Sequence, residues 1–227
     1  MAGVGLLNRK MILIDLDGTL VDSVPDLAFS VDEMMMHIGQ PRWGDAKVRE
    51  WVGNGVERLV KRALLGQLEG EPDADLYAKA FPYFMKVYAQ NTSLRSALYP
   101  GISKGLQALL ASGFRLGCVT NKAAAFTEPL LKAMGIYDNF EIVISGDTLA
   151  KKKPDPLPLL HAAEFFGVPA EQALMVGDSV SDVKAARAAG FAIVCMSYGY
   201  NHGMDIRDAN PDAVIDSLTE LLPLLSA

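Results

Sequence analysis

The sequence has few of the features of a secreted or membrane-spanning protein. It contains only two cysteines, Cys118 and Cys195, and both lie in short apolar segments, so we expect reduced, buried thiols rather than a disulfide. No cysteine–histidine spacing suggests a zinc site. No apolar run approaches the ~18 residues of a membrane helix. Only Gly3 to Leu7 is apolar ahead of Asn8, which is too short for a signal peptide, so we expect a cytoplasmic location.

The sequence also lacks an excess of basic residues. Lys and Arg number 21 against 27 Asp and Glu, which gives a formal net charge of −6. Nucleic acids and anionic membranes are bound through basic surfaces, so neither is an expected partner. With 227 residues, of which 50% are hydrophobic, the chain can bury a core without disulfides or structural zinc.

Short apolar runs alternate with helical spacing, mainly over the C-terminal half. Residues 10–16 form a mostly apolar run that stops at Asp17-Gly18-Thr19, as is typical of a strand buried on both faces of a parallel sheet. Similar runs occupy 114–120, 141–145, 173–177, 191–197 and 213–215. Helical spacing covers 102–111, 123–134, 156–166, 181–189 and 218–225. The alternation predicts a doubly wound, mostly parallel, Rossmann-like α/β sheet.

Residues 23–97 contain no convincing strand. Their apolar spacing predicts helices over 24–38, 45–67 and 73–90, separated by the Gly- and Pro-containing breaks at 39–41 and 70–72. We therefore expect an all-helical domain over 23–97, inserted into an α/β core that consists of 1–22 and 98–227.

Four groups of polar residues follow predicted strands, where open α/β sheets bind their ligands. They are Asp15-Leu16-Asp17, Thr120-Asn121-Lys122, Lys151-Lys152-Lys153 before Pro154-Asp155-Pro156, and Gly177-Asp178-Ser179-Val180-Ser181-Asp182. Taken singly, a pair of aspartates is usually a solvated turn and a lysine run a solvated face. Together and in this order, the groups resemble the four motifs of the haloacid-dehalogenase-like superfamily.

The resemblance implies phosphoryl transfer through an aspartyl-phosphate. It makes Asp15 the nucleophile and a metal ligand, and Asp17 the general acid and base, whose backbone carbonyl also reaches the metal. Lys153, which precedes the Pro-Asp-Pro of the family pattern, would pair with Asp15 and stabilise the transferring group. Members that act as dehalogenases lack the second aspartate, so the presence of Asp17 favours phosphoryl transfer.

The resemblance also implies a magnesium site and a phosphate site. Asp178 would bind Mg²⁺ with Asp15 and Asp17, and Asp182 would support that site. Thr120 and Asn121 would hold the phosphoryl oxygens together with Lys153.

A narrower resemblance lies in the predicted helical insert. Residues 50–64 and Tyr99-Pro100-Gly101 are similar to the cap segments of phosphoglycolate phosphatases. The candidates for substrate contact are Gly53, Asn54, Gly55, Arg58 and Arg62. The glycines permit a tight turn or close approach to a ligand, although a plain break between helices explains them equally well. Either arginine could meet a carboxylate or phosphate, and solvated surface is the alternative.

The expected reaction is Mg²⁺-dependent hydrolysis of a small phosphomonoester, with 2-phosphoglycolate as the leading substrate. The alternatives are a sugar phosphomutase similar to β-phosphoglucomutase, a nucleotide or pyrophosphate phosphatase, and a non-catalytic regulator that binds phosphorylated metabolites. The sequence leaves open whether the protein is a monomer or a homodimer. We expect Lys122 on the surface, with phosphate binding as the alternative, and His202 in a structural or surface role.

Overall fold

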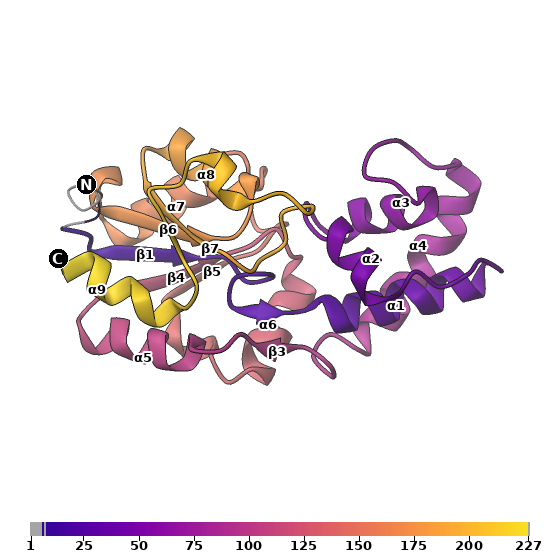
Figure 1. Cartoon of the computed structure of the whole chain (residues 1–227), viewed down its shortest axis with the longest axis horizontal. Coiled ribbons are helices and arrows are strands. Elements are labelled where there is room, and N and C mark those ends of the chain that lie inside the picture. Colours follow the sequence, from indigo (N-terminus) through magenta and orange to yellow (C-terminus); the bar gives the residue numbers. More distant parts are fainter. Residues whose placement is uncertain (1–5, 7, 227) are drawn as a thin grey trace.

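The computed structural model describes residues 6 and 8–226 (Figure 1), so the apolar segment from Gly3 to Leu7 lies outside the described residues apart from Leu6. The strands are β1 (Met11–Ile14), β2 (Val21–Asp22), β3 (Ala97–Leu98), β4 (Arg115–Val119), β5 (Ile142–Ile144), β6 (Ala173–Gly177), β7 (Ala192–Met196) and β8 (Ala213–Ile215). The helices are α1 (Val24–His37), α2 (Gly44–Trp51), α3 (Val56–Leu65), α4 (Ala74–Ala89), α5 (Ile102–Ala111), α6 (Ala124–Ala133), α7 (Leu157–Phe166), α8 (Val180–Ala189) and α9 (Leu221–Ser226). Short 3₁₀ helices cover Tyr137–Asn139, Ala170–Gln172, Ile206–Ala209 and Leu218–Glu220.

The main sheet is parallel and has the order β5-β4-β1-β6-β7-β8. Strand β1 is central, and its Ile12 lies in register with Leu116 of β4 and Leu174 of β6. All residues of β1 are buried, because helices cover both faces of the sheet. This explains the continuous apolar runs in the sequence and confirms the prediction of a doubly wound α/β fold.

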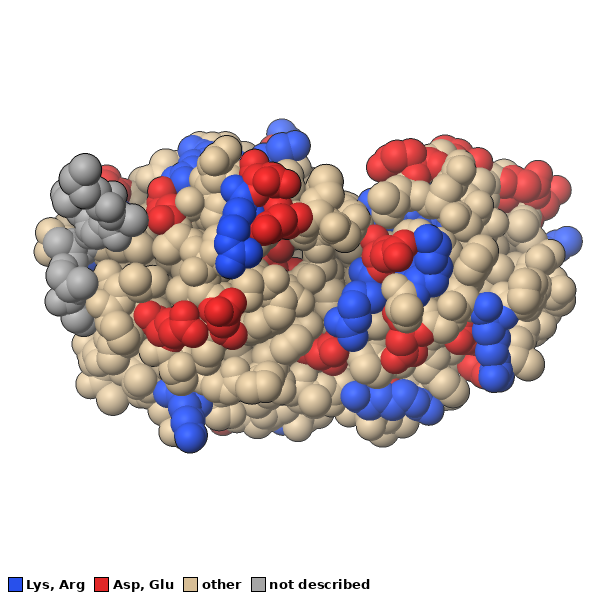
Figure 2. Space-filling view, in the orientation of Figure 1, with Lys and Arg blue, Asp and Glu red and all other residues tan. Residues whose placement is uncertain are grey.

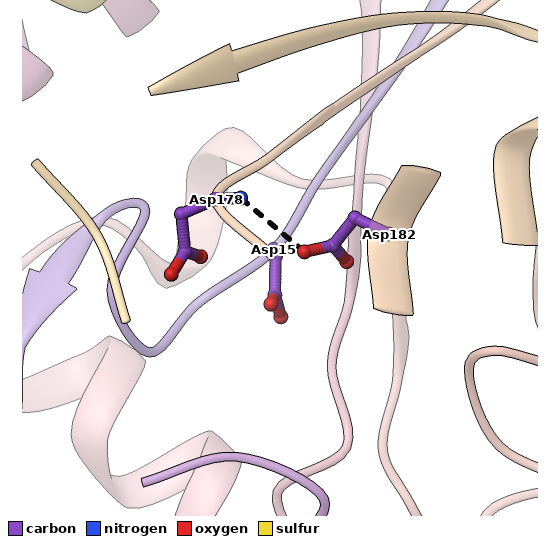
Figure 3. Close-up of side chains that lie close together, drawn as sticks. All are labelled: Asp15, Asp178 and Asp182. Carbon is purple, nitrogen blue, oxygen red and sulfur yellow. Dashed lines mark hydrogen bonds between the residues drawn. The ribbon is translucent and has the colours of Figure 1, made fainter. Parts of the chain in front are cut away.

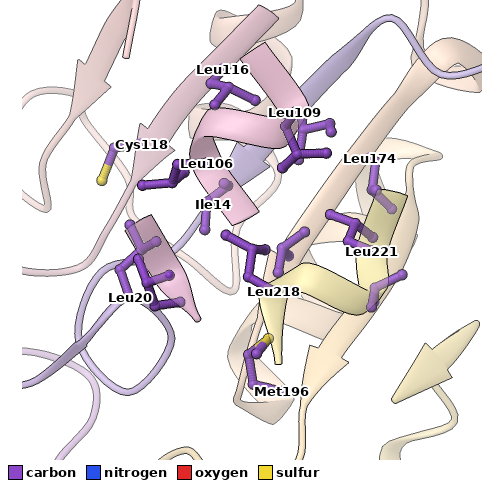
Figure 4. Close-up of a cluster of buried hydrophobic side chains, with 14 of the residues drawn as sticks. Ile14, Leu20, Leu106, Leu109, Leu116, Cys118, Leu174, Met196, Leu218 and Leu221 are labelled. Atoms are coloured by element: carbon purple, nitrogen blue, oxygen red, sulfur yellow. The ribbon is translucent and has the colours of Figure 1, made fainter. Parts of the chain in front are cut away.

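Two apolar layers fix the helices to the sheet. Helices α5, α6 and α9 pack on one face (Figure 4), where Ile14 meets Leu106 of α5 and Leu221 of α9 in one cluster. Helices α7 and α8 cover the opposite face, through residues such as Leu159 and Val183. The sheet edge that carries the carboxyl ends of the strands is left uncovered by these layers.

Helices α1 to α4 lie beyond that edge, at the opposite end of the molecule from the two termini (Figure 1). They have their own core, in which Trp51, Phe84 and Tyr88 are buried. The antiparallel ribbon β2–β3 connects them to the sheet. In place of the single helix predicted over 45–67 there are two, α2 and α3, because residues 53–55 all have positive φ angles and turn the chain between them.

The surface carries acidic and basic side chains interspersed on the face shown in Figure 2. Within the described part of the chain, none of the helices combines the length and the apolar character needed to cross a membrane.

Candidate active site

Three candidate residues lie together because of the strand order. Asp15, Thr120 and Asp178 each directly follow a strand, namely β1, β4 and β6, and β4 and β6 flank β1 in the sheet. Since these strands are parallel, their carboxyl ends share one edge and their following side chains face the same space.

Asp15, Asp178 and Asp182 form an acidic cluster at this edge (Figure 3). Each offers a carboxylate oxygen, and these oxygens lie within 4.8 Å of one another. Burial raises the pKa of Asp15 to about 7, although Lys153 lowers it. Burial and the neighbouring carboxylates also raise the pKa of Asp178 well above its ordinary value. The cluster thus holds more negative charge than its protein neighbours compensate, and oxygen ligands of this kind suit a hard divalent cation.

Lys153 and Asp182 are both buried and hold the cluster in place. The Lys153 Nζ lies 2.9 Å from Asp15 Oδ1 and 2.7 Å from Asp182 Oδ1, and it donates to Val119 O at 2.7 Å. The three ammonium donors therefore all have acceptors. The other oxygen of Asp182 accepts from Ser179 N and Ser179 Oγ at the start of α8, at 3.1 and 2.7 Å. Asp182 thus positions both the lysine and the loop that carries Asp178.

Thr120 and Asn121 lie on the loop after β4, beside the acidic cluster. Thr120 is buried, and its Oγ1 accepts from Lys122 N at 3.2 Å. Asn121 Nδ2 donates to Lys153 O at 2.8 Å, which ties this loop to the segment that carries the lysine. Asn121 Oδ1 is buried without a hydrogen-bond partner among the described residues.

Asp17 pairs with a residue that the sequence analysis assigned to the surface. Lys122 is only 5% exposed, and its Nζ lies 3.1 Å from Asp17 Oδ1 and 3.2 Å from Asp17 Oδ2. The expectation of a surface lysine was wrong, because the turn after β4 directs this side chain inward, against Tyr88 of α4.

Arg62 of α3 holds the turn between α2 and α3 through hydrogen bonds. This arginine is 4% exposed and donates to Trp51 O at 2.7 Å, Gly53 O at 3.2 Å and Asn54 Oδ1 at 3.2 Å. Its guanidinium therefore fixes the turn. Arg58, also on α3, pairs with two glutamates, Glu69 and Glu71.

The same turn touches the core. Lys152 Nζ donates to Asn54 O at 3.1 Å, and a Cβ on Gly55 would come within 3.3 Å of this Nζ. His202 Nδ1 lies 2.8 Å from Glu50 O, and a Cβ on Gly53 would lie 3.3 Å from the imidazole. The glycines thus sit where the helical segment closes against the core, and the positive φ of Gly53 favours glycine in any case.

Tyr200 links the acidic cluster to the β2–β3 ribbon, which connects the helical segment to the sheet. Its backbone N–H donates to Asp178 Oδ2 at 2.6 Å, and its hydroxyl donates to Asp22 Oδ1 at 2.5 Å. Arg49 of α2 pairs with the same Asp22 at 2.9 Å and stacks on the Tyr200 ring. A Cβ on the preceding Gly199 would overlap Asp178, so glycine is required for this approach.

A cavity of about 320 Å³ lies between the sheet edge and the helical segment, a size that suits a small ligand. From the core it is lined by residues that include Asp15, Asp17, Thr120, Asn121, Lys122, Lys153 and Asp178. From the helical segment it is lined by residues that include Gly53, Asn54, Gly55 and Arg62.

A model of the haloacid dehalogenase-like hydrolases matches residues 9–190, a range that contains every predicted site residue from Asp15 to Asp182. The chain belongs to this hydrolase family. Among the family's curated members, a phosphoglycolate phosphatase of Nitrosococcus oceani is 67% identical over 96% of each chain. A second, from Nitrosospira multiformis, is 49% identical over 95% of each chain.

Solved structures of the family have the same fold. A predicted phosphoglycolate phosphatase from Haemophilus somnus aligns with a TM-score of 0.90 and 37% identity, over 97% of this chain and 99% of that one. A point mutant of CbbY from Rhodobacter sphaeroides, in complex with xylulose-(1,5)-bisphosphate, aligns with a TM-score of 0.74 and 25% identity, over 93% and 96% of the two chains.

Two members of this site were missed in the sequence. Lys122 directly follows Thr120 and Asn121, so its place beside a strand end was the available signal, but sequence alone does not show burial. Tyr200 donates its backbone N–H to Asp178 from 22 residues further along the chain, and no side-chain pattern in the sequence predicts such a contact.

Proposed function

We propose that the protein hydrolyses 2-phosphoglycolate to glycolate and phosphate through an aspartyl-phosphate on Asp15. The observation that carries the reaction type is the pairing of Asp15 with the buried Lys153, at a sheet edge that also holds Asp17 and Asp178. The substrate is supported by the phosphoglycolate phosphatase that is 67% identical.

In the first step an Asp15 oxygen attacks phosphorus, and the bond from phosphorus to the ester oxygen breaks. Asp17 gives its proton to the departing glycolate oxygen. In the second step Asp17 takes a proton from water, which attacks the phosphorus of the acyl phosphate and restores the Asp15 carboxylate. Lys153 lies against the attacking carboxylate, where its charge can offset that of the transferring group.

The phosphoryl oxygens have three candidate partners. The Thr120 hydroxyl, the Asn121 backbone and the Lys153 ammonium line the same cavity as Asp15. A phosphoryl group bound there would be held beside the nucleophile, and such positioning is a main requirement of phosphoryl transfer.

Asp15, Asp178 and the Asp17 backbone carbonyl would hold Mg²⁺, and Asp182 would support them. The donor set fits, because the oxygens are hard ligands, and because burial, with neighbouring carboxylates, raises the pKa of Asp15 and Asp178, a cost of ionisation that a cation would offset. A bound Mg²⁺ would neutralise charge on the phosphate and on the nucleophile.

Residues 23–97 would act as a cap domain that excludes water from the cavity and selects the leaving group. The turn at Gly53, Asn54 and Gly55, held by Arg62, is one of the parts of this segment that line the cavity. Arg58, engaged with Glu69 and Glu71, would act at the outer rim.

The test is a screen of Mg²⁺-dependent phosphate release over a metabolite panel that includes 2-phosphoglycolate, nucleotides, pyrophosphate and sugar phosphates. The proposal expects 2-phosphoglycolate to have the highest kcat/KM and chelation to abolish turnover. A sugar bisphosphate is the second candidate, since the similar CbbY binds one. Conversion of a sugar phosphate into its isomer without phosphate release would identify a mutase, and binding without turnover of any ester would identify a regulator.

Small phosphorylated metabolites are thus the proposed partners, and the preferred one is a carboxylate-bearing phosphomonoester. Location in the cytoplasm stays a prediction.

A further inference from the structure

Lys122 is a buried cation that the reaction described above does not use. Its side chain is 2% exposed, and its Nζ contacts both oxygens of Asp17, at 3.1 and 3.2 Å. A lysine is rarely buried unless its charge is compensated. The two-oxygen contact fixes where the ionised Asp17 carboxylate lies, which matters for a base that must reach a water beside the phosphorylated Asp15.

The third partner of Lys122 comes from the helical segment. The Tyr88 hydroxyl of α4 contacts Lys122 Nζ, and the ammonium lies 5.0 Å from the centre of the tyrosine ring. Tyr88 is fully buried, and its ring packs against Phe84 of α4 and against Phe126 of α6 in the core. The contact between α4 and Lys122 therefore crosses from the helical segment to the sheet edge.

The charge of Lys122 is retained in this environment. Burial alone would lower the pKa of Lys122, but Asp17 and Tyr88 outweigh burial and raise it above its ordinary value. Burial also raises the pKa of Tyr88 to about 12, so its hydroxyl stays protonated. Lys122 thus donates to both carboxylate oxygens and to the phenol oxygen, which uses its three hydrogens.

We infer that Lys122 is a positioning residue that fixes the Asp17 carboxylate for taking a proton from water in the second step, and that Tyr88 makes this arrangement depend on closure of the helical segment. The inference rests on the proposed function, since it concerns the base of that reaction's second step. It assigns α4 a part in proton transfer in addition to enclosing the cavity. With the helical segment displaced, Lys122 would lose its phenol partner and Asp17 its fixed position.

The experiment compares Lys122→Met and Tyr88→Phe with the wild type, and uses Lys132→Met as the matched control. Lys132 lies on α6, ten residues further along, and pairs with Glu128 at the surface. We expect Lys122→Met to lower kcat for 2-phosphoglycolate about 100-fold, the lower end of the usual contribution of general acid–base catalysis, with KM within threefold of wild type. Tyr88→Phe keeps the ring and loses only the hydroxyl, so kcat should fall about tenfold. Lys132→Met should remain within twofold of wild type.

A second readout separates positioning from a merely structural effect. 4-Nitrophenyl phosphate has a leaving group that needs little protonation, so Asp15 attack should survive in Lys122→Met while the Asp17-assisted attack by water slows. Rapid mixing should therefore give a burst of nitrophenolate, close to one per enzyme, followed by slow turnover.

Three results would overturn the inference. The first is a kcat of Lys122→Met for 2-phosphoglycolate within threefold of wild type. The second is a raised KM of this variant with unchanged kcat, which would make Lys122 a substrate contact. The third is slow turnover of 4-nitrophenyl phosphate by this variant without a burst. If Lys122→Met does not fold, the kcat of Tyr88→Phe decides: a tenfold loss supports the inference and a wild-type value refutes it. If the wild type releases phosphate and Asp15→Asn does not, such a failure concerns Lys122 alone. If the wild type hydrolyses no ester, the proposed function fails first.

Discussion

Replacing Asp15 by asparagine should remove activity and at the same time stabilise the metal-free protein at pH 8. The pKa of Asp15 rises from 3.8 to about 7 in the folded chain, mainly because the carboxyl is buried. Folding therefore takes up a proton between about pH 4 and pH 7, so the free energy of unfolding falls as pH rises through that window. A rise of about 3 pKa units, at about 1.4 kcal/mol each, amounts to about 4 kcal/mol at pH 8. Asparagine does not ionise and escapes this cost.

The assay is urea-induced unfolding of both proteins in the presence of a chelator, at pH 5 and pH 8. The free energy of unfolding of Asp15→Asn should exceed that of the wild type by up to about 4 kcal/mol at pH 8 and by much less at pH 5. Asp155→Asn is the matched control, because Leu157 N and Lys151 lower the pKa of Asp155, so the same substitution should destabilise. A urea midpoint of Asp15→Asn at pH 8 that is equal to or lower than that of the wild type would refute the claim that burial makes ionisation of this carboxyl group unfavourable.

Three further predictions test the metal, the turn and the link to the ribbon. Saturating Mg²⁺ should raise the melting temperature of the wild type at pH 8, because 100-fold excess over Kd adds about 2.7 kcal/mol to the free energy of unfolding. Asp178→Asn should lose most of that rise, and equal shifts in the two proteins would show that Asp178 is not a metal ligand. Arg62→Met should raise KM for 2-phosphoglycolate about tenfold, because the turn at 53–55 loses hydrogen bonds that contribute roughly 1 kcal/mol each. An unchanged KM in steady-state kinetics would contradict this. Tyr200→Phe should lower the free energy of unfolding by about 1–3 kcal/mol, since Asp22 loses a buried partner; urea unfolding at wild-type midpoint would count against it.

The strands of the core could be predicted because each is a short, mainly apolar run, and those at the centre of the sheet, β1 and β6, are buried throughout. β6 was predicted with both of its bounds, and β1, β4, β5 and β7 to within one or two residues at each end. A strand covered on both faces is apolar throughout, so its limits are visible as the limits of an apolar run. The alternation with helices predicts a parallel sheet, and a parallel sheet brings the polar residues that follow its strands to one edge.

What the sequence did not reveal depends on backbone geometry and long-range contacts. The apolar spacing of α2 continues into α3 across residues 52–55, so the turn between them has no periodic signal, although its glycines gave a hint. The β2–β3 ribbon has two residues in each strand, too few for an alternation to be seen. Arginines usually lie at the surface, and the burial of Arg62 is revealed only by its four hydrogen bonds, which it makes to the end of α2, to the turn and to the α3–α4 connection.

The measurement that tests the account most directly is the acid-quenched phosphoenzyme. Wild-type protein is mixed with Mg²⁺ and 2-phosphoglycolate, quenched with acid during turnover, digested and analysed by mass spectrometry. The account predicts a phosphoryl group on the peptide that contains Asp15, and none for Asp15→Asn. Phosphate release by Asp15→Asn at the wild-type rate, or a phosphoryl group on a different peptide, would contradict it.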